Sequence, residues 1–319
     1  MSIEPFASGA ERRAPAPAGA GAMPNVPGAV YMAPGSRQRS PLWFAWRRFL
    51  ANKAAVIGGA VLGVIALMAI LAPLITVAGP TEQHFLADGL AFPSAQHWFG
   101  VDDLGRDFFS RIVYGARVSL TIGFTAALFS VLIGIPLGAI AGYYGGRADW
   151  FIMRVIEIFS VVPPLLAAML LGALAGGGFW MIVFIAGLFG WVQVCLLVRA
   201  QIKAFKEKEF VRAAQALGAS PGYIIRRHLI PNSVSPIIVG FVLAIPLAMM
   251  LEASLSFLGV GVPPPTPSWG QMINIGMNFM YFYWHMAVFP TAALAVTVLA
   301  TTLFGDGLRD ALDPTMKGT

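Results

Sequence analysis

Charged side chains are scarce in this chain. Asp, Glu, Lys and Arg make up 11% of the 319 residues, hydrophobic residues make up 57%, and the mean hydropathy is +0.74. Soluble domains carry about a quarter charged residues. The composition therefore excludes an ordinary soluble protein and predicts an integral membrane protein.

Cysteine and nucleotide-binding motifs are also lacking. The single cysteine, Cys195, excludes an intrachain disulfide and a metal cluster built on cysteine. The phosphate-binding pattern Gly-x-x-x-x-Gly-Lys-Ser/Thr occurs nowhere in the sequence, so the chain has no recognisable means of holding nucleotide phosphates. Any ATP hydrolysis that drives this protein must come from another polypeptide.

Six apolar stretches are long enough to cross a bilayer, which takes about 20 residues at helical rise. No alternation with a period of two residues is present, so helices are expected rather than barrel strands. Proline inside a span, as at Pro136, Pro163-Pro164 and Pro246, is tolerated because neighbouring helices satisfy the freed carbonyl groups. The predicted fold class is an all-α integral membrane protein with six transmembrane helices, over 54–78, 117–142, 151–175, 179–199, 236–258 and 286–305.

Three glycines in the second stretch, Gly134, Gly138 and Gly142, recur every four residues. Small residues at this spacing allow two helices to approach closely. Packing inside the bundle is favoured over a specific dimerisation face.

The distribution of Lys and Arg predicts the orientation. With the N-terminus in the cytoplasm, eighteen of the 21 Lys and Arg residues fall on the cytoplasmic side, and only Arg106, Arg111 and Arg117 fall outside. Cytoplasmic loops carry the excess of basic residues in membrane proteins. Both termini and the loop 200–235 are therefore predicted to be cytoplasmic, and the net charge of +6 gives no reason to expect nucleic acid as a partner.

The chain divides into three predicted regions. Residues 1–40 are rich in Ala, Pro and Gly, lack the apolar core of a signal peptide, and are predicted to be a disordered cytoplasmic tail. Residues 41–100 contain an interfacial helix with aromatic and basic residues at 43–49, the first span and an extracytoplasmic segment. Residues 101–319 form the core domain, with five spans and the cytoplasmic loop 200–235.

Three aspartates, Asp102, Asp103 and Asp107, are concentrated in the extracytoplasmic segment together with glycine and arginine. Their spacing does not match a calcium-binding loop. A turn pinned by Asp–Arg contacts is favoured, with Asp102 or Asp103 capping a short helix through 107–115.

Three histidines, His84, His97 and His285, also fall on the outer side without the spacing of metal ligands, so surface or interfacial roles are expected for them. No metal site is predicted.

The loop after the fourth span has a charged frame around a small apolar centre. Residues 211–217 favour a short helix, and Gly218 is placed to end it. Ala213, Ala214 and Gly218 leave little side-chain bulk, so a partner could approach the backbone closely. Docking of a cytosolic partner and folding back onto the chain's own bundle both remain open.

The run Arg212-Ala213-Ala214, then Gly218 and Ile230-Pro231, resembles the Glu-Ala-Ala…Gly…Leu-Pro loop of ATP-binding-cassette (ABC) importer permeases. Four further segments resemble the second (C-type) permease subunit of dipeptide, oligopeptide and nickel importers, and the resemblance covers about residues 41–314. These segments are 99–107, 143–146, 252–270 and 305–310.

The resemblance implies the type I importer permease fold and import of dipeptides or oligopeptides, with nickel or other small solutes less favoured. It implies no cofactor on this chain, ATP-Mg on two cytosolic ATPase subunits, a second homologous permease, an extracytoplasmic substrate-binding protein and surrounding membrane lipid. The location implied is the cytoplasmic membrane of a bacterium or archaeon.

The resemblance also implies site residues. A coupling helix that docks on the ATPase would include Glu209, Phe210, Arg212, Ala213, Ala214, Leu217, Gly218 and Pro231. Candidate contacts to the receptor or to a gate on the outer side are Asp102, Asp103, Gly105, Arg106 and Asp107.

Two positions depart from the family pattern. Arg212 replaces the leading Glu and reverses its charge, whereas Ile230 replaces a Leu conservatively. Glu209, one helical turn earlier, is the candidate to take over the contact of the missing Glu.

Glu252 lies near the outer end of the fifth span, with Ser254 and Ser256 close by. A carboxylate inside a membrane is a candidate for the transport pathway. A structural hydrogen-bonded network is the favoured alternative. Glu157 has Arg154 one turn before it, which predicts an ordinary ion pair.

Two rival functions are weighed against the importer permease. A secondary transporter driven by an ion gradient is expected to show internal repeats and ionisable residues at mid-membrane, but no convincing repeat is present and Glu252 lies off the midplane. An embedded hydrolase needs a base for its nucleophile, and no intramembrane His or Asp is placed to serve Ser254. A non-catalytic permease subunit is predicted.

Overall fold

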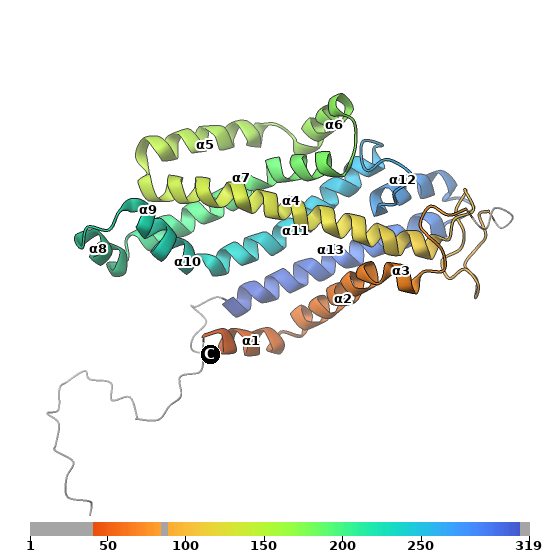
Figure 1. The fold of residues 1–319 in the computed structure, drawn as a ribbon, viewed down its shortest axis with the longest axis horizontal. Helices are drawn as coiled ribbons and strands as arrows, with labels where there is room; N and C mark the ends of the chain where they lie inside the picture. The colour runs from red at the N-terminus through yellow and green to blue at the C-terminus, as the bar shows by residue number, and fades with distance from the viewer. Residues whose placement is uncertain (1–40, 84–88, 313–319) are drawn as a thin grey trace, which may run out of the picture. The chain divides into compact units, whose positions relative to one another are not determined.

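The computed structural model describes residues 41–83 and 89–312, and within them every regular element is a helix. The tail predicted over 1–40 and His84 lie outside the described residues. The helices are α1 Pro41–Ala51, α2 Lys53–Ile70, α3 Ala72–Ile75, α4 Phe108–Tyr144, α5 Gly146–Val161, α6 Pro164–Ala175, α7 Phe179–Lys206, α8 Glu209–Ala216, α9 Pro221–Ile224, the π-helix η2 Ile225–Leu229, α10 Ile230–Asn232, α11 Val234–Phe257, α12 Trp269–Phe279 and α13 His285–Leu312 (Figure 1).

Five helices, α2, α4, α7, α11 and α13, are long and apolar enough to span a membrane. The stretch 151–175 supplies a sixth span only as a broken pair, because α5 and α6 meet at an angle of 80°. Pro163 and Pro164 explain the break: a proline disfavours helical backbone in the residue before it, and Val162 is extended with ψ 119°. The structure thus gives five unbroken spans and a sixth where the bent pair crosses as one, in agreement with the predicted all-α membrane fold.

The closest helix pair is α4 with α7, which run side by side along the centre of the bundle (Figure 1). All three glycines of the predicted stripe face α7. A Cβ atom added to Gly138 would lie 2.6 Å from the carbonyl oxygen of Cys195, and one added to Gly142 would lie 2.8 Å from the Cβ of Ile202. Packing within the bundle, rather than dimerisation, explains the stripe.

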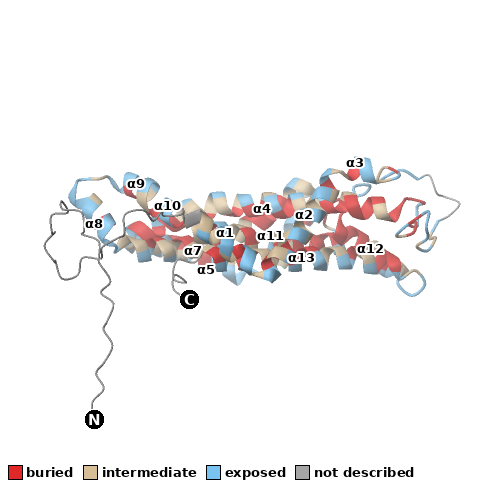
Figure 2. Ribbon diagram, turned by 90° about the horizontal axis from the view of Figure 1, so that it is seen from below, coloured by how far each residue is buried: buried red, intermediate tan, exposed pale blue. Residues whose placement is uncertain are grey.

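The outer faces of the spans are apolar and open in this chain. Figure 2 shows buried residues along the middle of the bundle and exposed ones on its outside. Leucines on five spanning segments are 55–63% exposed, which is expected where lipid or another membrane subunit covers them. They are Leu67, Leu132, Leu170, Leu247 and Leu299.

The aromatic and basic segment at 43–49 forms most of α1. Phe49 anchors this helix on α13, with its ring centroid 5.5 Å from that of Phe304. Phe44 and Trp46 remain 51% and 61% exposed. The helix therefore offers aromatic side chains to the surroundings while one side is fixed to the bundle.

The bundle has two different ends. Helices α8, α9 and α10 lie at one end, called here the α8 end, and α12 with the loops around 89–107 lies at the other, called here the α12 end (Figure 1). The candidate site residues fall into one group at each end and one buried group next to the α12 end.

Candidate functional site

The short helix α8 begins three residues after α7 ends. Gly218 terminates it with φ +80°, a conformation that L side chains rarely adopt, and its N–H donates to the carbonyl of Gln215 at 2.9 Å. The N–H of Ala219 donates to Ala214 at 3.1 Å. The predicted helix and its glycine stop are confirmed.

The two sides of α8 have different surroundings. Val211 is fully buried and packs on a cluster that includes Ile202 and Leu229, and Ala214 is half-buried against the same cluster. Phe210, Ala213 and Leu217 share the outer side, at i, i+3 and i+7 spacing, where Leu217 is 88% exposed and Phe210 40%. The loop thus folds back on its own bundle through one side of α8 and leaves an apolar side free.

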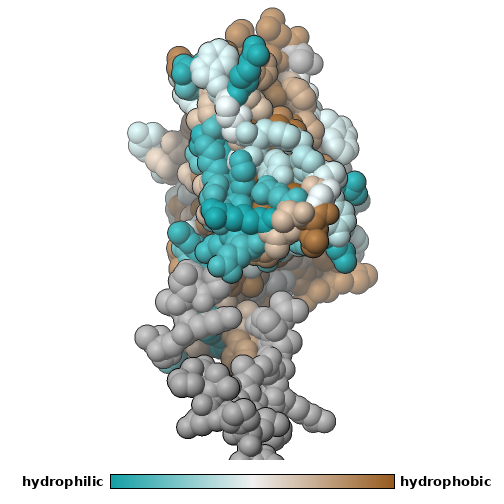
Figure 3. All heavy atoms as spheres, turned by 90° about the vertical axis from the view of Figure 1, so that its left-hand side faces the viewer, coloured by the Kyte–Doolittle hydropathy of each residue, from teal (hydrophilic) through white to brown (hydrophobic). Residues whose placement is uncertain are grey.

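We call Phe210, Ala213 and Leu217 the free face of α8. Ala214, a predicted docking residue, does not belong to it, because its methyl group points into the bundle. Figure 3 looks onto the α8 end, where hydrophilic side chains gather in one continuous area with apolar side chains at its edge. An exposed leucine beside a charged area is available to a protein partner.

The positive charge of Arg212 is paired with a carboxylate of the same loop. Its guanidinium lies 3.2 Å from Glu207, and both side chains are about two-thirds exposed, at 68% and 70%. Glu209 stands exposed in the first turn of α8, where the helix dipole favours a carboxylate. Pro231 is exposed at the start of α10, after the π-helical turn that returns the chain to α11.

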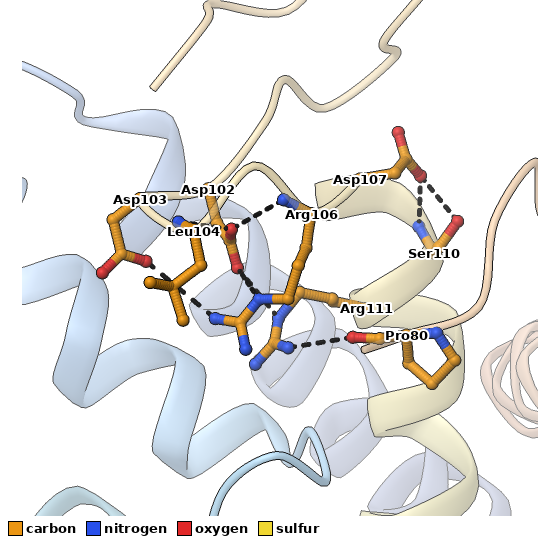
Figure 4. A network of polar contacts seen from close by, with 8 residues as sticks. All are labelled: Pro80, Asp102, Asp103, Leu104, Arg106, Asp107, Ser110 and Arg111. Carbon is orange, nitrogen blue, oxygen red and sulfur yellow. Dashed lines mark hydrogen bonds and ion pairs between the residues drawn. The ribbon is translucent and has the colours of Figure 1, made fainter. Parts of the chain in front are cut away.

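At the α12 end, Asp102 organises a tight turn (Figure 4). Its Oδ1 accepts the N–H groups of Leu104 at 3.0 Å and Arg106 at 2.9 Å. Its Oδ2 accepts Nε of Arg106 at 2.6 Å and lies 3.3 Å from Nε of Arg111. Gly105, at φ +70°, permits the turn. The prediction of a turn pinned by Asp–Arg contacts is confirmed.

The predicted cap at Asp102 or Asp103 is wrong. Asp107 caps the helix, because it directly precedes α4 and its Oδ2 accepts the N–H of Ser110 at 2.8 Å and the hydroxyl at 2.6 Å. The helix does not stop near residue 115 but continues through the second span to Tyr144.

Of the five candidate receptor or gate residues, four lie buried inside the chain. Asp102, Arg106 and Asp107 are at most 5% exposed and Gly105 is buried, whereas Asp103 keeps 29% of its side chain exposed. Asp103 is thus the member of the group whose side chain reaches the surface, and the contacts of all five with a receptor or a gate stay a prediction.

The expected surface role is wrong for His97 and His285, the two outer histidines within the described residues. His97 is 9% exposed, with Nδ1 3.5 Å from Asp107. His285 is fully buried among aromatic rings, including Phe92 at 5.2 Å, and neither ring nitrogen has a hydrogen-bond partner within the described residues. No cluster of three or more His, Cys, Asp or Glu side chains that could hold a metal is found in 41–83 and 89–312.

Glu252 is fully buried and joins two spans. Its Oε1 accepts the hydroxyl of Ser256 at 2.8 Å, and its Oε2 accepts that of Ser119 on α4 at 3.1 Å. Ser268, just before α12, extends the network through Ser256 at 3.3 Å.

Ser254 does not take part in this network. Its hydroxyl donates to the carbonyl of Met250 in its own helix, at 2.8 Å. The i, i+4 spacing identified Ser256 in the sequence, but no local signal pointed to Ser119 or Ser268. The structural alternative for Glu252 thus has a concrete geometry, and Glu157 pairs with Arg154 as expected.

Five unbroken spans, a sixth that is bent and the short, partly free helix α8 mark the chain as a multi-span membrane protein, and the comparisons with known families give its class as a membrane transport permease. The family of binding-protein-dependent transport system inner membrane components matches residues 134–318, and the N-terminal TM domain of oligopeptide transport permease C matches residues 40–93. The chain belongs to this family of binding-protein-dependent transport system inner membrane components. The resemblance to C-type permease subunits is confirmed.

Curated relatives are similar over most of their length. The dipeptide transport system permease protein DppC of Bacillus subtilis is 42% identical over 274 residues, 86% of this chain and 85% of the relative. The oligopeptide transport system permease protein OppC of the same species is 39% identical, covering 88% and 92%. The glutathione transport system permease protein GsiD of Pectobacterium atrosepticum is 41% identical, covering 88% and 93%.

Among solved structures, the MetNI methionine ABC transporter, described in inward facing conformations, has a similar chain. The TM-score is 0.50 at 17% identity, covering 64% of this chain and 96% of that one. This similarity concerns the fold and confirms the ABC importer permease fold class.

Proposed function

We propose that this chain is the C-type permease subunit of an ATP-driven importer that moves dipeptides and oligopeptides into the cytoplasm. The observation that carries the proposal is the free face of α8, an apolar surface at the charged end of the bundle. The names of the curated relatives support the substrate class, since they are permeases for dipeptides, oligopeptides and glutathione.

In this proposal the α8 end faces the cytoplasm and the α12 end faces outward. The excess of Lys and Arg supports that orientation, since only three of 21 fall on the other side. The free face of α8 then lies where cytosolic ATPase subunits can reach it. Both termini are cytoplasmic.

The ATPase subunits supply the energy and this chain supplies the path. The lack of a phosphate-binding loop supports this division of work. Closure of two ATPase subunits on ATP-Mg displaces α8, and the bundle rocks between inward-open and outward-open states. A second homologous permease and lipid cover the exposed outer faces of the spans, and a substrate-binding protein delivers solute at the α12 end.

The reversed charge at Arg212 fits this scheme. Since Glu207 already pairs with Arg212, the loop needs no acidic partner on the ATPase to neutralise it. Docking then depends on the free face of α8, with Glu209 as the remaining acidic side chain in its first turn.

Uptake into lipid vesicles tests the proposal. The complete complex, given a labelled dipeptide and its binding protein outside and ATP at the cytoplasmic face, is expected to accumulate the peptide, and omission of either ATP or binding protein is expected to abolish uptake. Uptake by this chain alone, driven by a proton gradient without ATP, would instead identify a secondary transporter and refute the proposal.

A further inference from the structure

Helix α5 is held to the rest of the molecule by few contacts. Only Ile152 and Ile156 of its sixteen residues are buried. Figure 1 shows α5 on the outside of the bundle, beyond α7. The two isoleucines pack on Trp191 and Cys195 of α7 and on Ala141 of α4. Helix α5 is therefore held by a narrow apolar seam against α7 and the end of α4.

Both ends of α5 are joints. At its start, Gly145 and Gly146 have φ +64° and +48°, and an added Cβ would meet nothing within 4 Å at either position. At its end, the chain turns by 80° before α6 begins at Pro164. Glycine pairs and proline breaks are where helices bend. Helix α5 can therefore change its angle to α4 at Gly145-Gly146 and its angle to α6 at the break before Pro164.

One polar cluster connects the first turn of α5 to α7. Asp149, in the first turn of α5, accepts both Nε and Nη2 of Arg199, the latter at 2.8 Å, and Nζ of Lys203 at 2.8 Å. Asp149 keeps 15% of its side chain exposed, against 25% for Arg199 and 44% for Lys203. A bidentate Arg–carboxylate pair defines both distance and angle, so Asp149 fixes the orientation of α5 as well as its position.

The two cations stand at the end of α7 that leads into α8. Lys206, the last residue of α7, lies over the ring of Tyr143 at 5.5 Å. Val211 of α8 packs into the cluster that contains Tyr143 and Ile202. The end of α7, the end of α4 and α8 thus form one packed unit, and Asp149 is the charged residue that ties α5 to it.

We propose that Asp149 is a positioning residue for transport, which makes α5 follow the movement of α7 and α8. When the ATPase subunits displace α8, the Arg199–Asp149–Lys203 latch carries the displacement to α5, which turns about Gly145-Gly146 and the break before Pro164. Without the latch, α5 keeps only its glycine connection and its apolar contacts, and its angle no longer follows α8. This inference rests on the proposed function, because the displacement comes from the ATPase.

The test measures peptide imported per ATP hydrolysed by the complete complex in vesicles, together with its thermal unfolding temperature. Asp149→Asn is expected to lower the ratio at least about fivefold, the lower end of usual coupling strengths, while ATP hydrolysis continues. The double variant Asp149→Arg with Arg199→Asp restores the ion pair in reverse and is expected to recover most of the ratio.

Glu157→Gln is the matched control. It removes a carboxylate from the same helix, but from a pair with Arg154 in which both side chains are more than half exposed, and it is expected to leave the ratio unchanged. A merely structural role for Asp149 would lower the unfolding temperature and the amount of complex with an unchanged ratio, and this result would overturn the proposal.

Two further outcomes have defined meanings. If the Asp149→Asn complex does not assemble, the substitution Lys203→Gln replaces it, because it leaves the Arg199–Asp149 pair in place. Lys203→Gln is expected to lower the ratio by less than the fivefold expected for Asp149→Asn. A ratio equal to that of the wild type would overturn the proposal. If the wild-type complex shows no ATP-dependent import, the proposed function itself fails. An active wild type with unaffected variants rejects the latch alone.

Discussion

Glu252 on α11 accepts a hydrogen bond from Ser119 on α4, a residue 133 positions earlier in the chain. Ser256 and Ser268 complete the network, which connects α4 and α11 to the segment before α12. Glu252 itself is fully buried. Buried polar groups are costly unless their partners are all present. The network therefore holds the α12 end of the bundle in one arrangement.

Replacing Glu252 with Ala is expected to destabilise the protein by about 1–3 kcal/mol, because the hydroxyl groups of Ser119 and Ser256 lose their acceptor inside the bundle. Thermal unfolding in detergent measures the effect. Ser254→Ala is the matched control, since that hydroxyl donates only to its own helix. Equal unfolding temperatures for the two variants would show that the network contributes nothing.

Asp102→Ala is expected to cost about 3–5 kcal/mol, because Arg106 and Arg111 would be left as buried cations without their shared carboxylate. Asp103→Ala removes a partly exposed carboxylate 3.9 Å from Arg106 and is expected to cost about 1 kcal/mol or less. Comparison of the two purified proteins by thermal unfolding checks this order. A larger effect at Asp103 would contradict the assignment of Asp102 as the centre of the turn.

A larger side chain at Gly138 is expected to disturb the contact between α4 and α7. The Cβ of Gly138→Ala would lie 2.6 Å from the carbonyl oxygen of Cys195, so the helices must separate, at a cost of about 1–3 kcal/mol. Gly63→Ala on α2 meets nothing within 4 Å and is expected to be neutral or stabilising by up to about 1 kcal/mol. Melting temperatures that fall equally in both variants would argue against close packing at Gly138.

Leu217→Gln is expected to weaken ATPase binding about tenfold or more. The stability of the permease is expected to stay unchanged, because the Leu217 side chain is 88% exposed in this chain. Co-purification of the ATPase subunits with the permease measures binding.

Val211→Ala is the comparison variant. Because Val211 is fully buried, its truncation is expected to lower the stability of the permease rather than to remove a contact with the ATPase. Ala214→Glu is not an informative docking variant, because Ala214 packs against the bundle core. Loss of ATPase binding with Val211→Ala but not with Leu217→Gln would place the docking surface elsewhere.

Local patterns predicted much of this molecule from the sequence. The six apolar stretches correspond to helices because helix length and apolar composition are set by the bilayer. The stop at Gly218 and the turn at Gly105 were predictable because each needs a residue that adopts positive φ. The bend between α5 and α6 was visible as Pro163-Pro164, although the sequence did not say whether neighbouring helices would keep the span straight.

The remaining features depend on contacts between distant residues. Ser119 and Glu252 have no common local pattern, so only the packing of α4 on α11 shows that they meet. The burial of His285 follows from the loop around Gly100 that covers it, and no property of the histidine itself indicates this. Asp107 rather than Asp102 caps α4 because the helix starts at Phe108, and helix boundaries are the least certain part of a prediction from sequence.

Photo-crosslinking from α8 in the complete complex tests most directly whether the free face of α8 contacts the ATPase. A photoreactive residue at position 217 is expected to give a product that contains the ATPase subunit, and the same residue at position 211, buried in wild type, is expected to link only within the permease. A product from position 217 that contains only lipid or permease, in a complex that hydrolyses ATP, would contradict docking through the free face.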